Sequence, residues 1–263
     1  SGNAVEGDFP TGIRMMLTGQ VFTVMADVAT DEQVVAIAKS ADKYLYDEAI
    51  GGYRLNTDFK ENILRMCIFS PNYNSSIKSW HIIGYVILLS NFSSPSFLLV
   101  FSHMATMYAN SLYHRGYAKE GYKVINSLFK HCDNYSKSGI YPGIPEYVSQ
   151  RGRGMYHYLT GAASWMLLTV LNEMYGVKGE YGALKLKPQL LKEQFENGEA
   201  SATCMFNGKN ITVTYKNDKA LDVEQYSVKE IYIDGNKYGD CDTVLKEDVM
   251  KLNDTVNIVA ILD

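Results

Sequence analysis

Hydrophobic and polar positions follow two different periods along this chain of 263 residues. From residue 15 to residue 176, apolar residues recur mostly at helical spacing. These stretches are 15–29, 34–45, 101–113, 118–132 and 161–175. From about residue 181 onward, apolar and polar residues alternate as they do in strands, over 200–206, 211–215, 228–233 and 256–262. The pattern predicts a mainly α part followed by a β tail.

Local signals fix the ends of several of these elements. Thr30 and Gln33 stand three residues apart before an apolar-periodic run, which predicts a helix that begins with a capping box. Gly176 follows the last predicted helix and is expected to end it. The pair Asn207–Gly208 between two alternating runs predicts a tight hairpin turn.

Composition describes a folded protein with no sign of a nucleic-acid partner. Of its residues, 46% are hydrophobic and 21% charged, and the net charge is -4 with a pI near 5.8. We expect no signal peptide, because Ser1–Asp8 is polar, and no membrane span, because polar residues interrupt the apolar window 82–101. The cysteines make no CxxC pair, which indicates free thiols in a reducing compartment, the cytoplasm. They are Cys67, Cys132, Cys204 and Cys241.

The start of the helix predicted at 161–175 is the main candidate for chemistry. Thr160 is a suitable N-cap, and Gly161 at the first helical position allows close approach to the backbone. The first turn of a helix carries unpaired N–H groups and attracts anions. Arg151, Arg153 and His157 precede it and add positive charge, the two arginines as solvated loop residues. The alternative is an ordinary capped helix that packs in the core.

Six segments together resemble glycoside hydrolase family 94, which contains the cellobiose, cellodextrin, chitobiose and β-1,2-oligoglucan phosphorylases. They are residues 51–58 (GGYRLNTD), 100–105 (VFSHMA), 140–147 (IYPGIPEY), 156–165 (YHYLTGAASW), 173–179 (EMYGVKG) and 184–188 (LKLKP). The resemblance covers most of the chain, but only the C-terminal part of a longer family protein. It implies part of an (α/α)6 helical barrel over residues 1–182 and a C-terminal antiparallel β sandwich over residues 183–263.

The same resemblance implies an inverting phosphorylase, in which phosphate attacks the anomeric carbon while a carboxylic acid protonates the glycosidic oxygen. His103, the Thr160 hydroxyl and the Gly161 N–H would contact phosphate. Glu146 is a candidate to face the sugar, with a role on the loop surface as the alternative, and Glu61 is a candidate for the acceptor-site glutamate of the family. The implied partners are a β-linked gluco-oligosaccharide and inorganic phosphate as co-substrate, with no further cofactor. The histidines show no zinc-type spacing, so we expect no metal. A homodimer is also implied.

Two departures from the family pattern bear on activity. The general acid of the family is an aspartate upstream of all these segments, and Asp8, Asp27 and Asp58 do not occupy that context. Residues 62–99 contain no acidic residue and lack helical periodicity. We interpret that stretch as a frameshifted or misassembled segment, with a true insertion as the alternative. The sequence therefore predicts a C-terminal fragment of a β-glucoside phosphorylase that is inactive alone.

Two other classes remain open. A different (α/α)6 enzyme, such as a glycoside hydrolase or an epimerase-like barrel, would need a pair of carboxylates, and we find no convincing pair in the sequence. A non-catalytic carbohydrate-binding or structural remnant would need only a sugar-binding surface. Binding of phosphate distinguishes the phosphorylase lineage from both.

Overall fold

A computed structural model of the chain describes residues 4, 6–60, 99–140, 143–156 and 160–263. The chain forms two compact units that are each assembled from separate stretches of sequence. The first unit comprises Ser1–Thr23, Ala29–Ala105 and Ser127–Thr160, and the second comprises Val24–Val28, Thr106–Asn126 and Gly161–Asp263. A division of the sequence at residues 182 and 183 stays a prediction.

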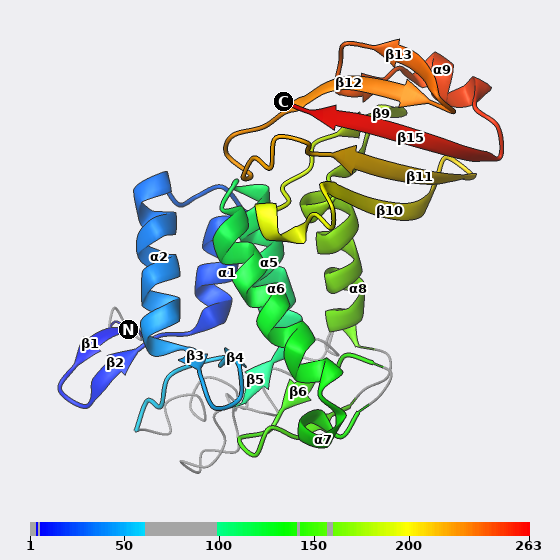
Figure 1. Ribbon diagram of the computed structural model, residues 1–263. Helices are drawn as coiled ribbons and strands as arrows, with labels where there is room; N and C mark the ends of the chain where they lie inside the picture. The colour runs from blue at the N-terminus through cyan, green and yellow to red at the C-terminus, as the bar shows by residue number, and fades with distance from the viewer. Residues whose placement is uncertain (1–3, 5, 61–98, 141–142, 157–159) are drawn as a thin grey trace, which may run out of the picture. The chain divides into compact units, whose positions relative to one another are not determined.

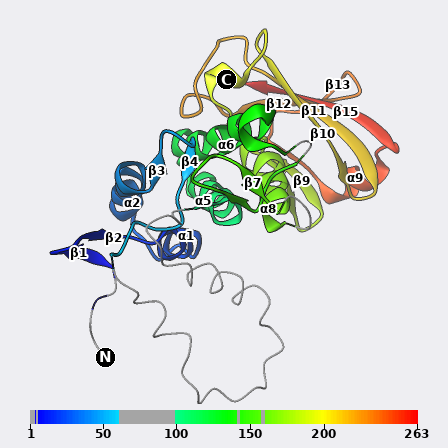
Figure 2. The same ribbon diagram turned by 90° about the horizontal axis from the view of Figure 1, so that it is seen from below.

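The first unit combines helices with very short strands. The β1–β2 hairpin projects away from α1 and α2 (Figures 1 and 2). Its elements are β1 (Gly7–Phe9), β2 (Gly12–Arg14), most of α1 (Leu17–Met25), α2 (Asp31–Tyr44), β3 (Tyr46–Asp47), β4 (Gly52–Tyr53), β5 (Val100–Phe101), α7 (Tyr135–Ser138), β6 (Tyr147–Val148) and β7 (Gly154–Met155). Besides α1, the helices α5 (Ser102–His114) and α6 (Ala118–Asp133) contribute residues to both units.

The capping box predicted at Thr30 is confirmed. The Thr30 hydroxyl accepts a hydrogen bond from the Gln33 N–H, and the Gln33 side chain accepts one from the Thr30 N–H. These two bonds satisfy N–H groups that the first turn of α2 leaves unpaired. Val34, Ala38 and Ala41 then form the buried stripe of the helix.

The carboxylate of Asp47 organises the turn between β3 and β4. It accepts hydrogen bonds from the N–H groups of Ala49 and Ile50 at 3.0 and 3.2 Å, and from Arg54 Nε and Nη2 at 3.0 and 2.6 Å. Only 9% of the Asp47 side chain is exposed. The Ile50 carbonyl oxygen lies 3.0 Å from Nδ1 of the buried His131, so α6 holds the same turn.

Burial and hydrogen bonding shift the pKa of Asp47 in opposite directions. Burial alone raises the pKa of this carboxyl group. The hydrogen bonds from Arg54 and from the Ile50 and Ala49 N–H groups, with the charge of Arg54, outweigh burial, so the pKa of Asp47 lies below its ordinary value of 3.8. A lowered pKa means that the folded state binds the charged form more favourably than the unfolded state does.

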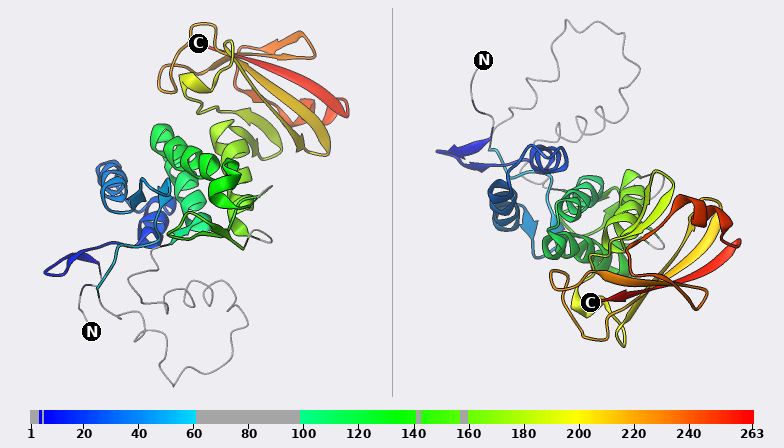
Figure 3. Two further views of the ribbon diagram at one scale, coloured as in Figure 1. Left: turned by 60° about the horizontal axis from the view of Figure 1, so that its bottom comes forward. Right: turned by 90° about the horizontal axis from the view of Figure 1, so that it is seen from above.

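The second unit is dominated by a five-stranded sheet in the order β10-β11-β15-β12-β13, which is strongly twisted (Figure 3). Its strands are β10 (Glu199–Phe206), β11 (Lys209–Lys216), β12 (Val228–Ile233), β13 (Asn236–Gly239) and β15 (Thr255–Leu262). A smaller antiparallel sheet has the order β14-β9-β8, from β8 (Val177–Glu180), β9 (Ala183–Leu186) and β14 (Thr243–Val244). The helical elements are α8 (Gly161–Leu168), the π-helical turn η1 (Thr169–Met174), the 3-10 turn η2 (Lys192–Gln194) and α9 (Lys246–Lys251).

Alternation along the long strands builds the core of the second unit. Ile211, Val213 and Tyr215 on β11 are buried, and so are Val256 and Ile258 on β15, with the intervening residues more exposed. Each buried aliphatic side chain contributes about 1.5–3 kcal/mol relative to exposure. The Tyr215 hydroxyl donates a 2.6 Å hydrogen bond to the carbonyl at the end of η1, on Tyr175.

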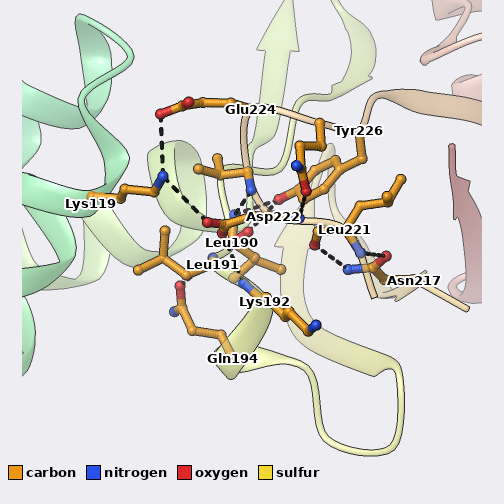
Figure 4. A network of polar contacts seen from close by, with 12 residues as sticks. Lys119, Leu190, Leu191, Lys192, Gln194, Asn217, Leu221, Asp222, Glu224 and Tyr226 are labelled. Carbon is orange, nitrogen blue, oxygen red and sulfur yellow. Dashed lines mark hydrogen bonds and ion pairs between the residues drawn. The ribbon is translucent and has the colours of Figure 1, made fainter. Parts of the chain in front are cut away.

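Polar side chains fasten the loop after β11 to the rest of this unit (Figure 4). The Tyr226 hydroxyl both accepts from the Leu190 N–H and donates to the Leu190 carbonyl, each at 2.7 Å. Lys119 on α6 reaches Asp222 at 3.3 Å and Glu224 at 3.5 Å. These contacts connect the loop to α6 and to Leu190, in the stretch before η2.

The predicted fold class, a mainly α chain with a partial (α/α)6 barrel and a C-terminal antiparallel β sandwich, is wrong. Five sheets are present among the described residues, and three of them precede residue 160. The main C-terminal sheet is mixed, because β15 lies between β11 and β12 and pairs with β11 in parallel. Strands of two residues, such as β6, are too short to show alternation in the sequence.

Individual elements agree better with the sequence. The predicted helices at 15–29, 34–45, 101–113, 118–132 and 161–175 correspond to α1, α2, α5, α6 and α8 with η1. The strands predicted at 200–206, 211–215, 228–233 and 256–262 are confirmed as β10, β11, β12 and β15. Asn207 and Gly208 form the hairpin turn with φ of 49° and 76°.

We predict that Gly176→Ala strongly destabilises the protein. Gly176 has φ of +64°, and a Cβ atom there would lie 1.8 Å from the Lys187 carbonyl oxygen. Gly208→Ala is the matched control, because Gly208 has φ of +76° with nothing within 4 Å. Left-handed backbone alone costs an alanine about 1–2 kcal/mol, which Gly208→Ala should show in urea unfolding. Gly176→Ala should lower the free energy of unfolding clearly more than Gly208→Ala does. Equal losses in the two variants would contradict the clash with Lys187.

We also predict that the Asp47–Arg54 pair makes stability depend on pH. Asp47→Asn should be about 1–3 kcal/mol less stable than wild type at pH 7, since it loses hydrogen bonds to a charged partner. Because the folded pKa is lowered, this contribution is present above the ordinary pKa of 3.8 and is lost as the pH falls further. Urea unfolding at pH 7 and pH 3 measures the difference between the two proteins, which should shrink at pH 3.

The control for this prediction is Asp58→Asn. Asp58 pairs with Lys60, whose side chain is 59% exposed. Surface pairs contribute about 0–1 kcal/mol, so this change should have the smaller effect at pH 7. A difference between wild type and Asp47→Asn that stays constant from pH 7 to pH 3 would contradict the role of the Asp47 charge.

Candidate functional site

The candidate site lies in the first unit, at the start of α5, and short strands place it there. Gly52 on β4 lies against the Val100 side chain, where a Cβ atom would come within 3.2 Å. Arg54 continues this contact through a β-bridge to Val100, and the Leu55 N–H donates to the Leu99 carbonyl at 3.0 Å. β5 therefore follows from the position of β4, which the Asp47 turn fixes.

β5 also pairs with β6, which brings a distant part of the chain to the same place. Val100 pairs with Val148 and Phe101 with Tyr147. The Ser102 N–H then donates to the Glu146 carbonyl at 2.9 Å, as α5 begins. Residues about 45 positions apart along the sequence thus share one corner.

His103 and Glu146 lie side by side at this corner. Nδ1 of His103 lies 3.8 Å from Oε1 of Glu146, and the two side chains are 19% and 17% exposed. Sequence reasoning named both residues, one for phosphate and one for sugar, but did not predict that they adjoin. A partly exposed imidazole beside a carboxylate can donate and accept hydrogen bonds toward a polar ligand.

Oγ of Ser102 and Oε2 of Glu146 are buried oxygen atoms at the corner that have no hydrogen-bond partner in the part of the chain that the structure describes. Ser102 is fully buried. An unpaired buried polar group costs about 1–3 kcal/mol, so both atoms lower the stability of this corner.

Aromatic rings surround the pair. Phe101 stacks on Tyr147 with centroids 4.9 Å apart, and it meets the His103 ring edge-on at 5.7 Å. Tyr156 lies edge-on to Tyr147 at 6.0 Å and is 55% exposed. Its carbonyl accepts the Glu146 N–H at 2.8 Å, and its φ is +54°. A non-glycine residue held in this strained conformation beside a polar pair is a candidate for function.

The Thr160–Gly161 helix start is confirmed as the beginning of α8 at Gly161. Thr160 belongs to the first unit and Gly161 to the second, so their joint contact with an anion stays a prediction. Arg151 and Arg153 are exposed, as expected for loop charges. Glu61 and His157, like the stretch 62–98, lie outside the described residues.

The three aspartates weighed against the general acid occupy other positions. Asp8 is exposed on β1, and Asp58 pairs with Lys60. Asp27 belongs to the second unit, where its carboxylate lies 3.3 Å from Arg115 Nε and 3.9 Å from His114 Nε2. Each of the three carboxylates is thus either solvated or paired with a cationic side chain.

A second cluster of charged residues continues from His114. Nδ1 of His114 lies 3.9 Å from Glu173, and the buried Glu173 accepts a 2.8 Å hydrogen bond from Lys178. Each carboxylate of this cluster lies beside a lysine or arginine, Asp27 beside Arg115 and Glu173 beside Lys178, which suits a structural role. Among the described residues, no three His, Cys, Asp or Glu side chains are grouped in a way that could hold a metal ion.

Three of the four cysteines are described, and all are free thiols: Cys132, Cys204 and Cys241. Burial raises the pKa of Cys132 to about 12, so this thiol is not a nucleophile near neutral pH. No helix within the described ranges is both long enough and apolar enough to cross a membrane.

Sequence reasoning missed Ser102 and Tyr156. Both stand within segments that carry the family resemblance, but neither has a side chain that the local pattern marks as reactive. The abundance of tyrosine was the available signal for Tyr156, since aromatic rings stack on sugars as well as fill cores. The strain at Tyr156 and the burial of Ser102 appear only in three dimensions.

No protein-family model and no curated protein sequence matches this chain. Among solved structures, it is similar to a family GH92 alpha-mannosidase from Bacteroides thetaiotaomicron, both alone and in complex with mannoimidazole. In both comparisons the identity is 18%, the TM-score is 0.26 and 62% of this chain is covered. The chain spans only 17% and 18% of the length of those two chains. Similarity at this level carries no argument about fold or activity, and the resemblance to family 94 rests on its sequence segments alone.

Proposed function

We propose that this chain is a carbohydrate-binding piece of an inverting β-glucoside phosphorylase, with a site for a β-linked gluco-oligosaccharide and inorganic phosphate, and that it is inactive alone. The observation that carries the proposal is the His103–Glu146 pair at the start of α5. Both residues lie in the segments that resemble family 94. Their neighbours supply the aromatic and polar groups that a sugar needs.

The sugar would lie over Tyr156. An exposed tyrosine ring offers an apolar face to the C–H groups of a pyranose. Glu146 would accept hydrogen bonds from sugar hydroxyl groups through the exposed part of its carboxylate, since 17% of its side chain is exposed. Apolar stacking with a few well-placed polar groups is the usual composition of a small-molecule site.

Phosphate would be bound by His103, with the Thr160 hydroxyl as a further donor. Glu146 itself is unsuited to this task. Two unit charges of the same sign about 4 Å apart repel by about 4 kcal/mol at an effective dielectric constant of 20. This repulsion favours a division of labour in which Glu146 faces the sugar and His103 faces the anion.

The same repulsion supports a second candidate function, a carbohydrate-binding module without phosphate. A carboxylate 3.8 Å from His103 lowers the attraction of the corner for an anion. A neutral sugar is not repelled by this carboxylate. The two functions differ in whether phosphate binds at all.

Turnover requires an acid that protonates the glycosidic oxygen. Asp8, Asp27 and Asp58 are exposed or paired elsewhere, as described above. We propose that the acid belongs to another part of the complete enzyme. The chain then supplies binding groups and no proton donor.

We predict that Tyr156→Ala weakens binding of sophorose or cellobiose about fivefold to tenfold, which corresponds to about 1–1.4 kcal/mol of lost stacking. Isothermal titration of the full chain measures the affinity. Tyr135→Ala is the matched control, because Tyr135 on α7 is similarly exposed, at 64% against 55%. Equal affinities in wild type and Tyr156→Ala, or no binding of either disaccharide by wild type, would contradict the sugar site.

Titration with inorganic phosphate distinguishes a piece of a phosphorylase from a carbohydrate-binding module. We expect binding by wild type and at least a tenfold loss in His103→Ala and in Thr160→Ala, since each change removes a hydrogen bond to a charged ligand, worth about 1.5–3 kcal/mol. Arg151→Ala should change little, because Arg151 is an exposed loop residue. Sugar binding without phosphate binding would favour the binding module.

We further expect no release of phosphate from glucose 1-phosphate in the presence of glucose or sophorose, because the general acid would belong to another part of the complete enzyme. A phosphate assay on the full chain measures this, with heat-denatured protein as the blank. Release above the blank would show that the chain contains a functioning acid.

A further inference from the structure

The five-stranded sheet has two edges of very different character, and they point to an interaction surface. β10 forms one edge and β13 the other (Figure 1). Unpaired strand edges offer rows of N–H and C=O groups that can pair with another strand, and proteins commonly block them. This inference stands independently of the proposed function.

The β13 edge is blocked in three ways. The strand has only four residues, and its register against β12 shifts between Ile231 and Tyr232. Lys237 in the strand forms ion pairs with Glu230 at 2.9 Å and Asp240 at 2.6 Å. A short edge, an irregular register and a lysine each disfavour pairing with another chain.

The β10 edge has none of these features. It is a regular strand of eight residues whose pairing with β11 shows no shift of register. It contains no proline, and its only charged residue, Glu199, stands at one end. Met205 near the other end is 67% exposed.

The hairpin turn determines which backbone groups of β10 point outward. With a two-residue turn at Asn207–Gly208, the flanking pair Phe206–Lys209 is hydrogen-bonded, and the pairs alternate from there. The N–H and C=O groups of Ser201, Thr203 and Met205 therefore point away from β11. Glu199 has the same parity, and its N–H and C=O indeed bond to Glu196.

No backbone hydrogen bond joins residues 200–206 to anything but β11 within the described part of the chain. Because the outward groups repeat at every second residue, they match the spacing of one more antiparallel strand.

We propose that two copies of this chain associate through their β10 strands, which pair in antiparallel fashion about a two-fold axis at Thr203. Thr203 then lies opposite its own copy, and Ser201 lies opposite Met205. On the other face of the strand, Ala202 lies opposite Cys204. The outward N–H and C=O groups of each strand pair with those of the other, which extends the sheet across both copies.

The side chains of β10 are complementary to themselves in this register. Small Ala200 meets large Phe206, so their volumes fit across the pair. Glu199 meets Asn207 of the turn, so the carboxylates of the two copies do not face each other. No like charges oppose the association at any position from 199 to 207.

Sedimentation velocity of the full chain over a range of concentrations tests the association. We expect a concentration-dependent dimer for wild type and a monomer for Thr203→Pro. Proline removes the outward N–H, which β11 does not use, and edge strands tolerate it. Thr203→Val is the control: it also loses the 2.9 Å contact with the Thr212 hydroxyl but keeps the N–H, so it should remain dimeric. A monomeric wild type, or a dimer that survives Thr203→Pro, overturns the proposal.

A cross-link tests the register without relying on the proline variant. Residues 202 and 204 of opposite copies would form a non-hydrogen-bonded pair, with Cα atoms about 4.5 Å apart, close enough for a disulfide. Ala202→Cys incubated with oxidised glutathione should give a disulfide-linked dimer with the native Cys204. The link should disappear in Ala202→Cys/Cys204→Ser, and a dimer that stays linked without Cys204, or no linked dimer in Ala202→Cys, overturns the pairing.

Discussion

The Asp47 carboxylate is the contact on which the first unit depends. It holds the turn before β4 through two backbone N–H groups and the Arg54 side chain. β4 in turn supports Val100, and Ile50, Val100 and Val148 pack together in a small core. Since β5 leads directly into α5, the positions of Ser102 and His103 follow from a polar contact about fifty residues earlier in the chain. Strands of two residues bury too little apolar surface to fix this geometry alone.

The candidate site combines groups with opposing preferences. His103 suits an anion and Glu146 opposes one, yet they lie 3.8 Å apart. A ligand that brings both a sugar and a phosphate satisfies both groups only if its hydroxyls face Glu146 and its charge faces His103. The position of Tyr156 is fixed relative to Glu146, because its carbonyl accepts the Glu146 N–H and its backbone has a φ of +54°. Such an arrangement selects orientation, whereas catalysis would further require a proton donor.

The sequence predicted elements whose signals are local and left out those that depend on distant partners. Thr30 and Gln33 cap one helix by contacts within a single turn, and Asn207–Gly208 fixes a hairpin by its own backbone preferences. The parallel pairing of β15 with β11 was not predictable, because strand alternation is the same for both directions of pairing. At the site, His103 and Glu146 were named from segments of the sequence. Their proximity depends on β5 pairing with β6, and two-residue strands leave no periodic signal.

The two units are therefore stabilised by different physics. Long alternating strands in the second unit bury aliphatic side chains, a contribution that is insensitive to charge. The first unit places its site with hydrogen bonds to one ionised carboxylate, so its geometry depends on a protonation state. Because the loss of one partner from a buried polar contact costs the full desolvation of the other, small changes at Asp47 or Arg54 would act on β5 and α5 together. A site built on such a support is sensitive to substitutions that never touch its ligand.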